Sequence, residues 1–437
     1  MDLIKLSAIE ALKMMEEDSL SSEEYVKAFL KQIELREDDV GAWIFLDPKL
    51  ALEQAREADK RRKGKSAGKL NGLPIGIKDI IDTKDMPTEN GSLLCKNRQP
   101  LNDAHLVKLL RDEGAVIMGK CVTTEFALSG PGKTKNPRDL ECTPGGSSSG
   151  SAAAVSDYMV PLAIGSQTGG LFKAASFTGI LGFKPTFGTI SRSGMSPISQ
   201  RLDHPGIYAN CVEDIDLVAS VILSYDSDDL DMIQNYQYKK NVNLNEPIKF
   251  GFVRGPVWNF GDEDMQSGIE DFVKKTSLNV EELDLGRDFD DAARAHEIIM
   301  NGSIVNSLIN YYQADKSNLH PFTVKRIEAG IPVSASDYVS AIEKAKKMEQ
   351  ILGQVFLKYD AIITPASTGQ APRDLMNTGN AIFNGYWTMM GVPAISLPFL
   401  KGKDDLPIGI QFITNWNEDL KLLEICKYIL KKEKLAD

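Results

Sequence analysis

The sequence predicts an α/β fold, and two observations support that prediction. Stretches with apolar residues at helical spacing alternate along the chain with short, continuous apolar runs that are typical of buried strands. The composition is that of an ordinary globular protein, with 42% hydrophobic and 25% charged residues. At 437 residues, the chain is long enough to bury a large core.

Three helices are predicted at the start of the chain. Apolar residues recur at helical spacing from Ser7 to Arg36, and the polar segment 18–24 divides this stretch in two, because it supplies N-cap residues followed by carboxylates. A charged helix fits 49–63. The segment 73–82 then reads as a buried strand that carries one lysine, Lys78. Lysines are rarely buried without a reason, so this residue is a candidate for function.

Helical and strand patterns keep alternating in the rest of the chain. The predicted helices are 102–114, 264–275, 335–358 and 419–432. The predicted strands are 114–120, 248–253, 359–365 and 409–413. The segment 225–247 is rich in Asp, Asn, Tyr and Lys, and is predicted to be a surface connection.

Charge and composition argue against several classes of protein. The net charge of −11 argues against a protein dedicated to binding nucleic acid directly, which would normally present a basic face. No apolar run approaches the ~20 residues of a membrane span, and no signal peptide is visible. Five cysteines and four histidines are scattered without metal-ligand spacing. We therefore expect a cytoplasmic protein without a metal, a cofactor or a membrane partner, and a homodimer is the default assembly.

Two glycine-rich turns form the centre of the sequence. The first elbow, GGSSSG at 145–150, and the second elbow, GSQTGG at 165–170, flank an apolar run at 152–164. Glycines let the backbone turn sharply and bring N–H groups close to a bound group. With hydroxyls in one elbow, N–H donors in the other and Lys78 upstream, these segments form a candidate acyl-transfer site. Either elbow alone is equally consistent with a connecting loop, because short glycine motifs recur by chance.

Taken together, these motifs resemble the amidase signature family. The matching segments, in the family's order, are 72–79, 144–155, 165–170, 177–188, 359–365 and 391–398. The resemblance implies a single large α/β domain over residues 1–437, with core motifs at 70–215 and a more variable region at about 225–355. It implies a mixed central sheet surrounded by helices, and an activity that hydrolyses the carbon–nitrogen bond of a small-molecule amide.

The resemblance also implies a Ser–cis-Ser–Lys mechanism. Lys78 would be the base, and Ser147, after a cis peptide bond, would relay the proton. A buried lysine can be neutral and accept a proton, which an exposed lysine at pH 7 cannot do. Backbone N–H groups of Thr168, Gly169 and Gly170 would form the oxyanion hole, where one well-placed donor contributes ~2.7–4 kcal/mol. No metal or cofactor is implied.

The sequence departs from the family pattern at the nucleophile. In the family, the two glycines are followed by a serine and, within a few residues, by arginine, proline and alanine. Here Gly170 is followed directly by Leu171, and the segment is one residue short, as though the serine itself were absent. Lys173 stands near the usual arginine and Ala174 near the usual proline. Leucine cannot attack a carbonyl, so the activity of this sequence is in doubt.

Other hydroxyls do not replace the serine in register. Ser166 and Thr168 precede the glycines, and Ser176 belongs to the following helix. Loss of the nucleophilic serine in a comparable triad costs on the order of a millionfold in turnover. Two explanations stay open: a pseudoenzyme that retains ligand binding, or a sequence altered at this point.

Two further interpretations follow from individual residues. The A subunit of the tRNA-dependent amidotransferases shares the fold and both elbows and is an alternative identity. Those subunits usually carry aspartate where Gln167 stands, and Gln167 together with Trp387-Thr388 favours a free-standing amidase. A set of large apolar residues is more typical of core than of an acyl pocket: Trp258, Phe260, Trp387, Met389 and Met390.

Overall fold

A computed structural model describes residues 2–128, 130–238, 242, 244 and 247–433. Within them, eleven strands form one mixed sheet in the order β1-β3-β2-β4-β6-β5-β10-β11-β9-β7-β8. The strands are β1 (Trp43–Leu46), β2 (Pro74–Lys78), β3 (Val116–Cys121), β4 (Leu162–Gln167), β5 (Leu181–Lys184), β6 (His204–Ala209), β7 (Lys249–Phe252), β8 (Asn279–Glu282), β9 (Ala361–Pro365), β10 (Ala394–Lys401) and β11 (Pro407–Ile413). The α/β fold with a mixed central sheet is therefore confirmed.

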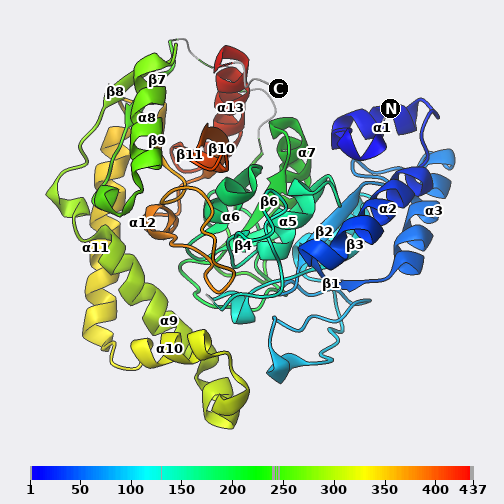
Figure 1. The fold of residues 1–437 in the computed structure, drawn as a ribbon, viewed down its shortest axis with the longest axis horizontal. Coiled ribbons are helices and arrows are strands. Elements are labelled where there is room, and N and C mark those ends of the chain that lie inside the picture. Colours follow the sequence, from blue (N-terminus) through cyan, green and yellow to red (C-terminus); the bar gives the residue numbers. More distant parts are fainter. Residues whose placement is uncertain (1, 129, 239–241, 243, 245–246, 434–437) are drawn as a thin grey trace.

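Helices surround this sheet. They are α1 (Ala8–Glu16), α2 (Ser22–Val40), α3 (Pro48–Lys63), α4 (His105–Asp112), α5 (Ser149–Ser156), α6 (Leu171–Thr178), α7 (Val212–Ile222), α8 (Glu263–Lys275), α9 (Ala292–Asp315), α10 (Pro321–Gly330), α11 (Ala335–Val355), α12 (Ile382–Met389) and α13 (Asp419–Glu433). Figure 1 shows α1–α3 at one end of the molecule and α8–α11 at the other, with α5, α6, β4 and β6 between them. None of the helices in the described part of the chain has the length and apolarity that a membrane span requires.

Local sequence explains where the predicted helices begin. The polar segment 18–24 does divide the first stretch into α1 and α2, and each of these helices begins with a capping box. In α1, the Ser7 side chain accepts a hydrogen bond from the Glu10 backbone, and the Glu10 side chain accepts one from the Ser7 backbone. Such pairs satisfy N–H groups that the first helical turn leaves without a partner.

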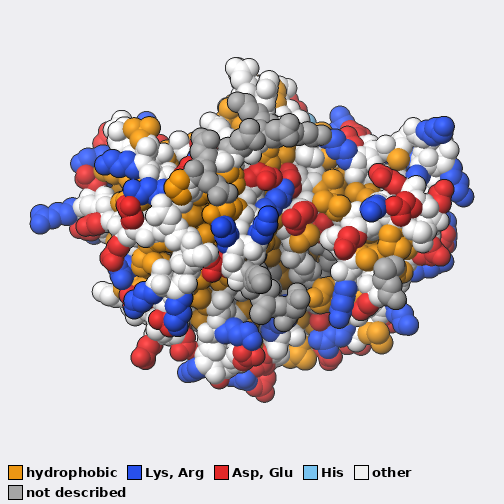
Figure 2. Space-filling view, turned by 90° about the horizontal axis from the view of Figure 1, so that it is seen from above, with side chains coloured by type: hydrophobic (Ala, Val, Ile, Leu, Met, Phe, Trp, Pro, Cys, Tyr) orange, Lys and Arg blue, Asp and Glu red, His pale blue; other side chains and the backbone are white. Residues whose placement is uncertain are grey.

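Most predicted elements are present, but others had no recognisable pattern in the sequence. The segment 276–334, for which no element was predicted, contains β8, α9 and α10. The described part of the predicted surface connection, 225–238, contains no helix or strand, and residues 239–241, 243 and 245–246 lie outside the described residues. Basic and acidic side chains alternate over the face seen in Figure 2, as an acidic protein of mixed surface charge would show.

Candidate active site

The sheet places Lys78 and the second elbow at the same edge. Strands β2 and β4 are parallel neighbours, with Ile75 opposite Leu162 and Ile77 opposite Ile164. Lys78 is the last residue of β2, and the second elbow continues from the end of β4. In open α/β sheets, ligands bind outside the carboxyl ends of such strands. The register therefore brings together two segments that are far apart in sequence.

Lys78 is buried and bonded to two serine hydroxyls. Its Nζ lies 2.6 Å from Ser147 Oγ and 2.8 Å from Ser166 Oγ. Burial lowers the pKa of the Lys78 amine to about 7, against an opposing effect of the Asp203 carboxylate. The neutral amine, the state in which a lysine accepts a proton, is therefore accessible near pH 7.

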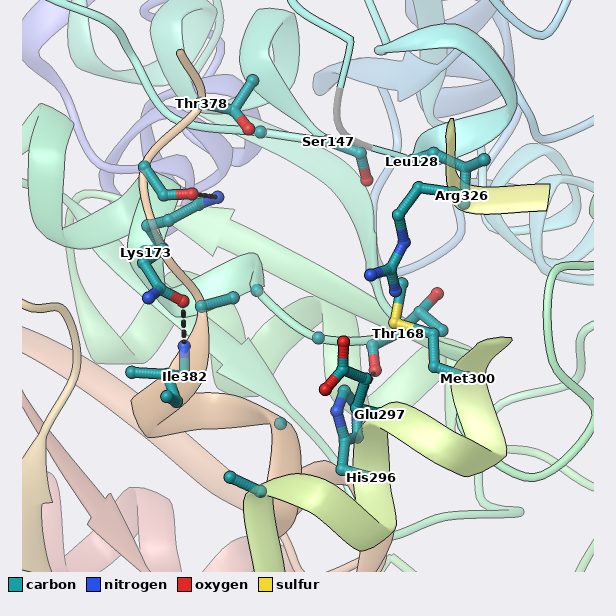
Figure 3. Close-up of a pocket in the computed structure, with 18 of the residues that line it drawn as sticks. Leu128, Ser147, Thr168, Lys173, His296, Glu297, Met300, Arg326, Thr378 and Ile382 are labelled. Atoms are coloured by element: carbon teal, nitrogen blue, oxygen red, sulfur yellow. Dashed lines mark hydrogen bonds between the residues drawn. The ribbon is translucent and has the colours of Figure 1, made fainter. Parts of the chain in front are cut away.

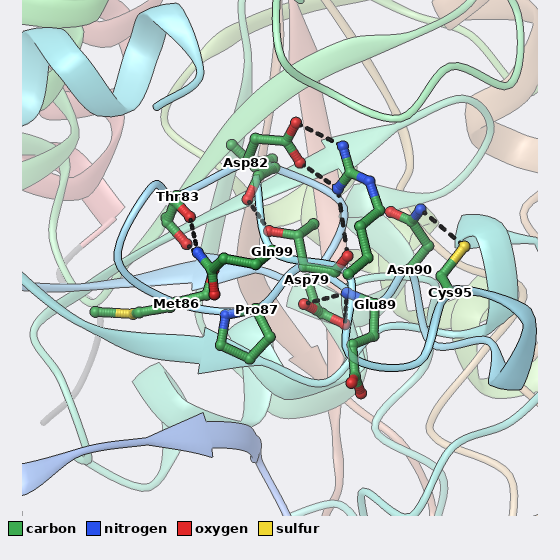
Figure 4. Close-up of polar contacts among 12 residues, drawn as sticks. Asp79, Asp82, Thr83, Met86, Pro87, Glu89, Asn90, Cys95 and Gln99 are labelled. Atoms are coloured by element: carbon green, nitrogen blue, oxygen red, sulfur yellow. Dashed lines mark hydrogen bonds and ion pairs between the residues drawn. The ribbon is translucent and has the colours of Figure 1, made fainter. Parts of the chain in front are cut away.

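The segment after Lys78 is held by a dense set of polar contacts, which Figure 4 shows. Asp79 accepts hydrogen bonds from the backbone of Glu89 and Gly91, at 3.2 and 3.4 Å. Lys120 of β3 lies 3.4 Å from the Asp79 carboxylate. The ion pair between Asp82 and Arg98 closes the other side of this loop. These contacts fix the backbone after residue 78, and the pairing of β2 with β3 and β4 fixes the backbone before it, so the lysine amine has a defined position.

The two elbows are in direct contact. The Ser148 hydroxyl accepts from the backbone N–H of Ser166 at 3.1 Å. Gly145 has a φ of +83°, and a Cβ there would lie 2.9 Å from Cα of Ala174, so only glycine fits this turn. The peptide bond between Gly146 and Ser147 is cis, the geometry that the resemblance implies. The Lys78 amine thus bonds to a serine of each elbow, Ser147 of the first and Ser166 of the second.

Buried polar side chains hold the second elbow in shape. The Thr168 hydroxyl donates to Asp203 Oδ1 at 2.6 Å, and the backbone of Ile198 and Ser199 donates to Asp203 Oδ2 at 2.8 and 2.9 Å. Burial raises the pKa of the Asp203 carboxyl, whereas these hydrogen bonds favour its charged form. A carboxylate with three donors is thus the anchor of the elbow.

Gln167 joins the elbow to two helices. Its amide nitrogen donates to the Thr388 hydroxyl of α12 at 2.7 Å, and its amide oxygen accepts from the backbone of Phe172 in α6 at 3.3 Å. The backbone N–H groups of Gly169 and Gly170 form no hydrogen bond with any part of the chain that the structure describes. They are therefore available to a bound group, as oxyanion donors would have to be.

Leu171 is part of the core and does not face the site. Helix α6 begins at Leu171 directly after Gly170. A Cβ at Gly206 would lie 2.3 Å from one methyl carbon of Leu171, and a Cβ at Gly182 would lie 2.8 Å from the other. The leucine side chain therefore packs against glycines of β6 and β5 and is 1% exposed. Its position is that of an apolar residue of the helix and not that of a nucleophile.

A cavity of about 710 Å³ lies over the elbows. It is lined by Ser147, the second elbow from Thr168 to Gly170, α9, α10 and the loop 377–381 that leads into α12. Figure 3 shows the side chains that face this cavity, including Lys173, His296 and Arg326. Lys78 lies behind Ser147 and is not part of the lining. A proton exchanged between the cavity and Lys78 would therefore pass through Ser147.

Two cavity residues come from helices that the sequence did not predict. His296 of α9 approaches the Thr168 carbonyl oxygen with its Nε2 at 3.0 Å. Since a carbonyl only accepts, Nε2 carries the proton. Burial lowers the pKa of His296 to about 4, so the ring is neutral at pH 7. His296 thus holds the elbow from the side of the helices.

The second of these residues, Arg326 of α10, brings a positive charge to the cavity lining. It forms no hydrogen bond or ion pair with the described residues, and its buried Nε has no partner. Burial lowers the pKa of its guanidinium, opposed by Glu297, but an arginine stays charged in proteins. A charged fork of N–H donors facing a cavity suits a carboxylate. No group of three or more His, Cys, Asp or Glu side chains among the described residues could hold a metal ion.

The predicted site residues thus fall in one place. Lys78, Ser147, Thr168, Gly169 and Gly170 all lie at the cavity or directly behind it, and their catalytic roles stay predictions.

The sequence did not identify several residues that support the site: Asp203, His296 and Arg326. No motif marked these residues: Asp203 and His296 bond to Thr168 from distant elements, and Arg326 lines the cavity from α10. The large apolar residues considered for an acyl pocket are absent from the lining: Trp258, Phe260, Trp387, Met389 and Met390.

Comparison with known proteins finds relatives that match nearly the whole chain. The Amidase family model matches residues 24–423. The Glutamyl-tRNA(Gln) amidotransferase A subunit of Agathobacter rectalis is 33% identical over 94% of this chain and 91% of that protein, and that of Clostridium botulinum is 33% identical over 95% of each. The solved structure of the peptide amidase from Stenotrophomonas maltophilia is 26% identical, with a TM-score of 0.83 over 99% of this chain and 98% of that one. The chain belongs to the amidase signature family.

Proposed function

We propose that this protein binds a small-molecule amide in the cavity above Ser147 and that, without a nucleophilic serine, it hydrolyses the carbon–nitrogen bond at most very slowly. One observation carries the proposal. Ser147 and two free backbone donors lie at one cavity with Lys78 directly behind Ser147, yet the residue after Gly170 points into the core. The site therefore keeps what is needed to hold an amide and lacks the atom that attacks it.

Arg326 supports a particular class of amide. Its guanidinium faces the cavity without an internal partner, and the exposed Arg294 also contributes to the lining. Glu297 is the one carboxylate among the described lining residues, and no hydrogen bond or ion pair joins it to Arg326. The two arginines outnumber it, which favours a ligand that carries its own negative charge. The amide we propose therefore bears a carboxylate, as in a free amino-acid amide such as glutamine or asparagine.

The test combines binding with turnover. Calorimetry with glutamine, asparagine and the uncharged amide propionamide measures binding, and ammonia release measures hydrolysis. We expect binding of a carboxylate-bearing amide without ammonia release above background. Ammonia release by the unaltered protein that disappears in Lys78→Ala would contradict the proposed loss of function, since it would require another hydroxyl to attack.

A second candidate is a subunit of a tRNA-dependent amidotransferase. The relatives at 33% identity bear that name, and they match over nearly their whole length. Gln167 argues against this candidate, because it occupies the place of an aspartate that is usual in those subunits. Affinity purification from the native host distinguishes the two. Recovery of a glutamyl- or aspartyl-tRNA-binding partner would favour the subunit, and a homodimer by light scattering would favour the free-standing protein.

A further inference from the structure

Among the described residues, four lysines have almost completely buried side chains: Lys78, Lys120, Lys173 and Lys184. Three of them have evident structural roles or belong to the predicted mechanism. Lys78 is bonded to two serines. Lys120 pairs with Asp79 and donates to the Ile81 carbonyl at 2.8 Å. Lys184 donates to the carbonyls of Pro185 and Val392, away from the cavity.

Lys173 differs from the other three. It lies in the first turn of α6, lines the cavity and is 4% exposed. Its Nζ makes one hydrogen bond, to the carbonyl oxygen of Gly379 at 3.0 Å, and no described carboxylate lies within ion-pair distance. In the view of Figure 3, Lys173 faces the cavity from the side opposite Arg326. Burial lowers the pKa of its amine to about 7.

These features match what an amine nucleophile needs. An amine attacks only in its neutral form, and desolvation without a counter-ion is one way in which proteins keep lysine neutral. A single carbonyl acceptor uses one of the amine's protons and leaves the nitrogen lone pair free. Lys173 is among the residues that line the cavity of about 710 Å³, so a small molecule in this cavity lies beside its side chain.

We propose that Lys173 captures an aldehyde in this cavity as an imine. The nitrogen forms a bond to the carbonyl carbon, and the amine loses a proton as the carbonyl oxygen becomes the hydroxyl of a carbinolamine. That hydroxyl then takes up a proton and leaves as water as the carbon–oxygen bond breaks. The nitrogen gives up its remaining proton, so that both amine protons end in the water and a carbon–nitrogen double bond remains. No oxidant or reductant is consumed.

The surroundings of Lys173 assist both steps. The free N–H groups of Gly169 and Gly170 line the same cavity and can stabilise the negative oxygen that develops during attack. Ser147, bonded to Lys78, is a proton donor that faces the same space. None of this requires the missing serine, so the capture of an aldehyde is independent of amide hydrolysis.

Reductive trapping tests the proposal on the full-length protein. The protein is treated at pH 7 with acetaldehyde or glyoxylate and with cyanoborohydride, which reduces an imine to a stable amine. Peptide mass spectrometry then gives the rate of labelling at each lysine. Because an exposed lysine with a pKa near 10.4 is less than about 0.1% neutral at pH 7, we expect Lys173 to be labelled at least tenfold faster than the exposed lysines.

Lys184 is the matched control. Burial lowers the pKa of its amine to about 7 as well, but it does not line the cavity. We expect no label at Lys184. The unaltered protein and Lys184→Met should each carry one adduct per molecule, and Lys173→Met should lose that adduct. Site mapping on the unaltered protein gives a result even if a variant does not fold. Labelling confined to exposed lysines and the N-terminus with both aldehydes would overturn the proposal and leave the proposed amide binding untouched.

Discussion

Two variants distinguish a deleted serine from a replaced one. If the serine was replaced by Leu171, then Leu171→Ser restores the nucleophile. If it was deleted, only a serine inserted between Gly170 and Leu171 does so. The structure favours deletion, because the Leu171 side chain is buried against Gly182 and Gly206 and is not part of the cavity lining.

The packing of Leu171 also gives the expected loss of stability in Leu171→Ser. Leu171→Ser removes three apolar carbons, at ~0.8 kcal/mol each, from a site that is 1% exposed. The residual cavity and a buried hydroxyl add about 1–2 kcal/mol. We expect a total loss of ~3–5 kcal/mol, which lowers the melting temperature by about 3–5 °C in a chain of 437 residues. Leu171→Ala, which lacks the hydroxyl, is the control for packing alone.

Activity is measured as ammonia release from glutamine, asparagine and propionamide. We expect no gain with Leu171→Ser. We expect the insertion variant to exceed the unaltered protein by several orders of magnitude, since the nucleophile of a comparable triad contributes on the order of 10⁶ to turnover. Lys78→Ala in the insertion variant should abolish the gain. Turnover by Leu171→Ser equal to that of the insertion variant would refute the deletion, because residue 171 would then occupy the position of the nucleophile.

Three other substitutions test the remaining parts of the site. Arg326→Met should weaken binding of a carboxylate-bearing amide by about tenfold or more, because a charge-assisted hydrogen bond contributes about 1.5–3 kcal/mol. The control is Lys325→Met, an exposed position on the same helix, which should leave the affinity unchanged. Calorimetry measures the affinity of both variants. Asp203→Ala leaves two buried N–H groups and a hydroxyl without an acceptor, so we expect a loss of ~3–5 kcal/mol in thermal unfolding, and unchanged stability would contradict the anchoring role. Lys78→Met should stabilise the protein at pH 7, and this gain should shrink as the pH rises towards 10. The pKa of Lys78 falls from 10.5 to about 7 on folding, so between these pH values the unfolded chain binds more protons than the folded chain. The unaltered protein therefore becomes more stable as the pH rises, and the advantage of the variant shrinks. Melting curves of both proteins at pH 7 and 9.5 test the sign of this change.

The sequence predicted those parts of the site that form short, recognisable motifs. Both elbows consist of short glycine motifs that need a particular backbone, and Lys78 ends a continuous apolar strand, so each left a readable signal. The departure from the family pattern was also visible, because the spacing after Gly170 is a property of the sequence alone. Only the structure gives the direction of the Leu171 side chain, because this side chain contacts Gly182 of β5 and Gly206 of β6, two strands that lie further along the sequence.

The far wall of the cavity could not be predicted for a physical reason. Helix α9 has no apolar face that repeats with helical period, because it carries polar residues such as Asn301 and Ser303 among its buried positions. A helix packed on several sides does not show the pattern that marks a surface helix. His296 and Arg326 therefore lie on elements that the sequence did not reveal, and their approach to the elbow depends on tertiary packing.

Asp203 and Lys78 are both buried and polar, but they affect the stability of the fold in opposite ways. Asp203 accepts three hydrogen bonds and holds the chain together, so stability alone accounts for its presence. Lys78 is different, because a buried lysine without a close carboxylate destabilises the folded protein at neutral pH. A chain that needed only the fold would be more stable with an apolar residue at this position. Lys78, with its bond to Ser147, is therefore costly to the fold, and this cost supports the proposal that the cavity serves a ligand.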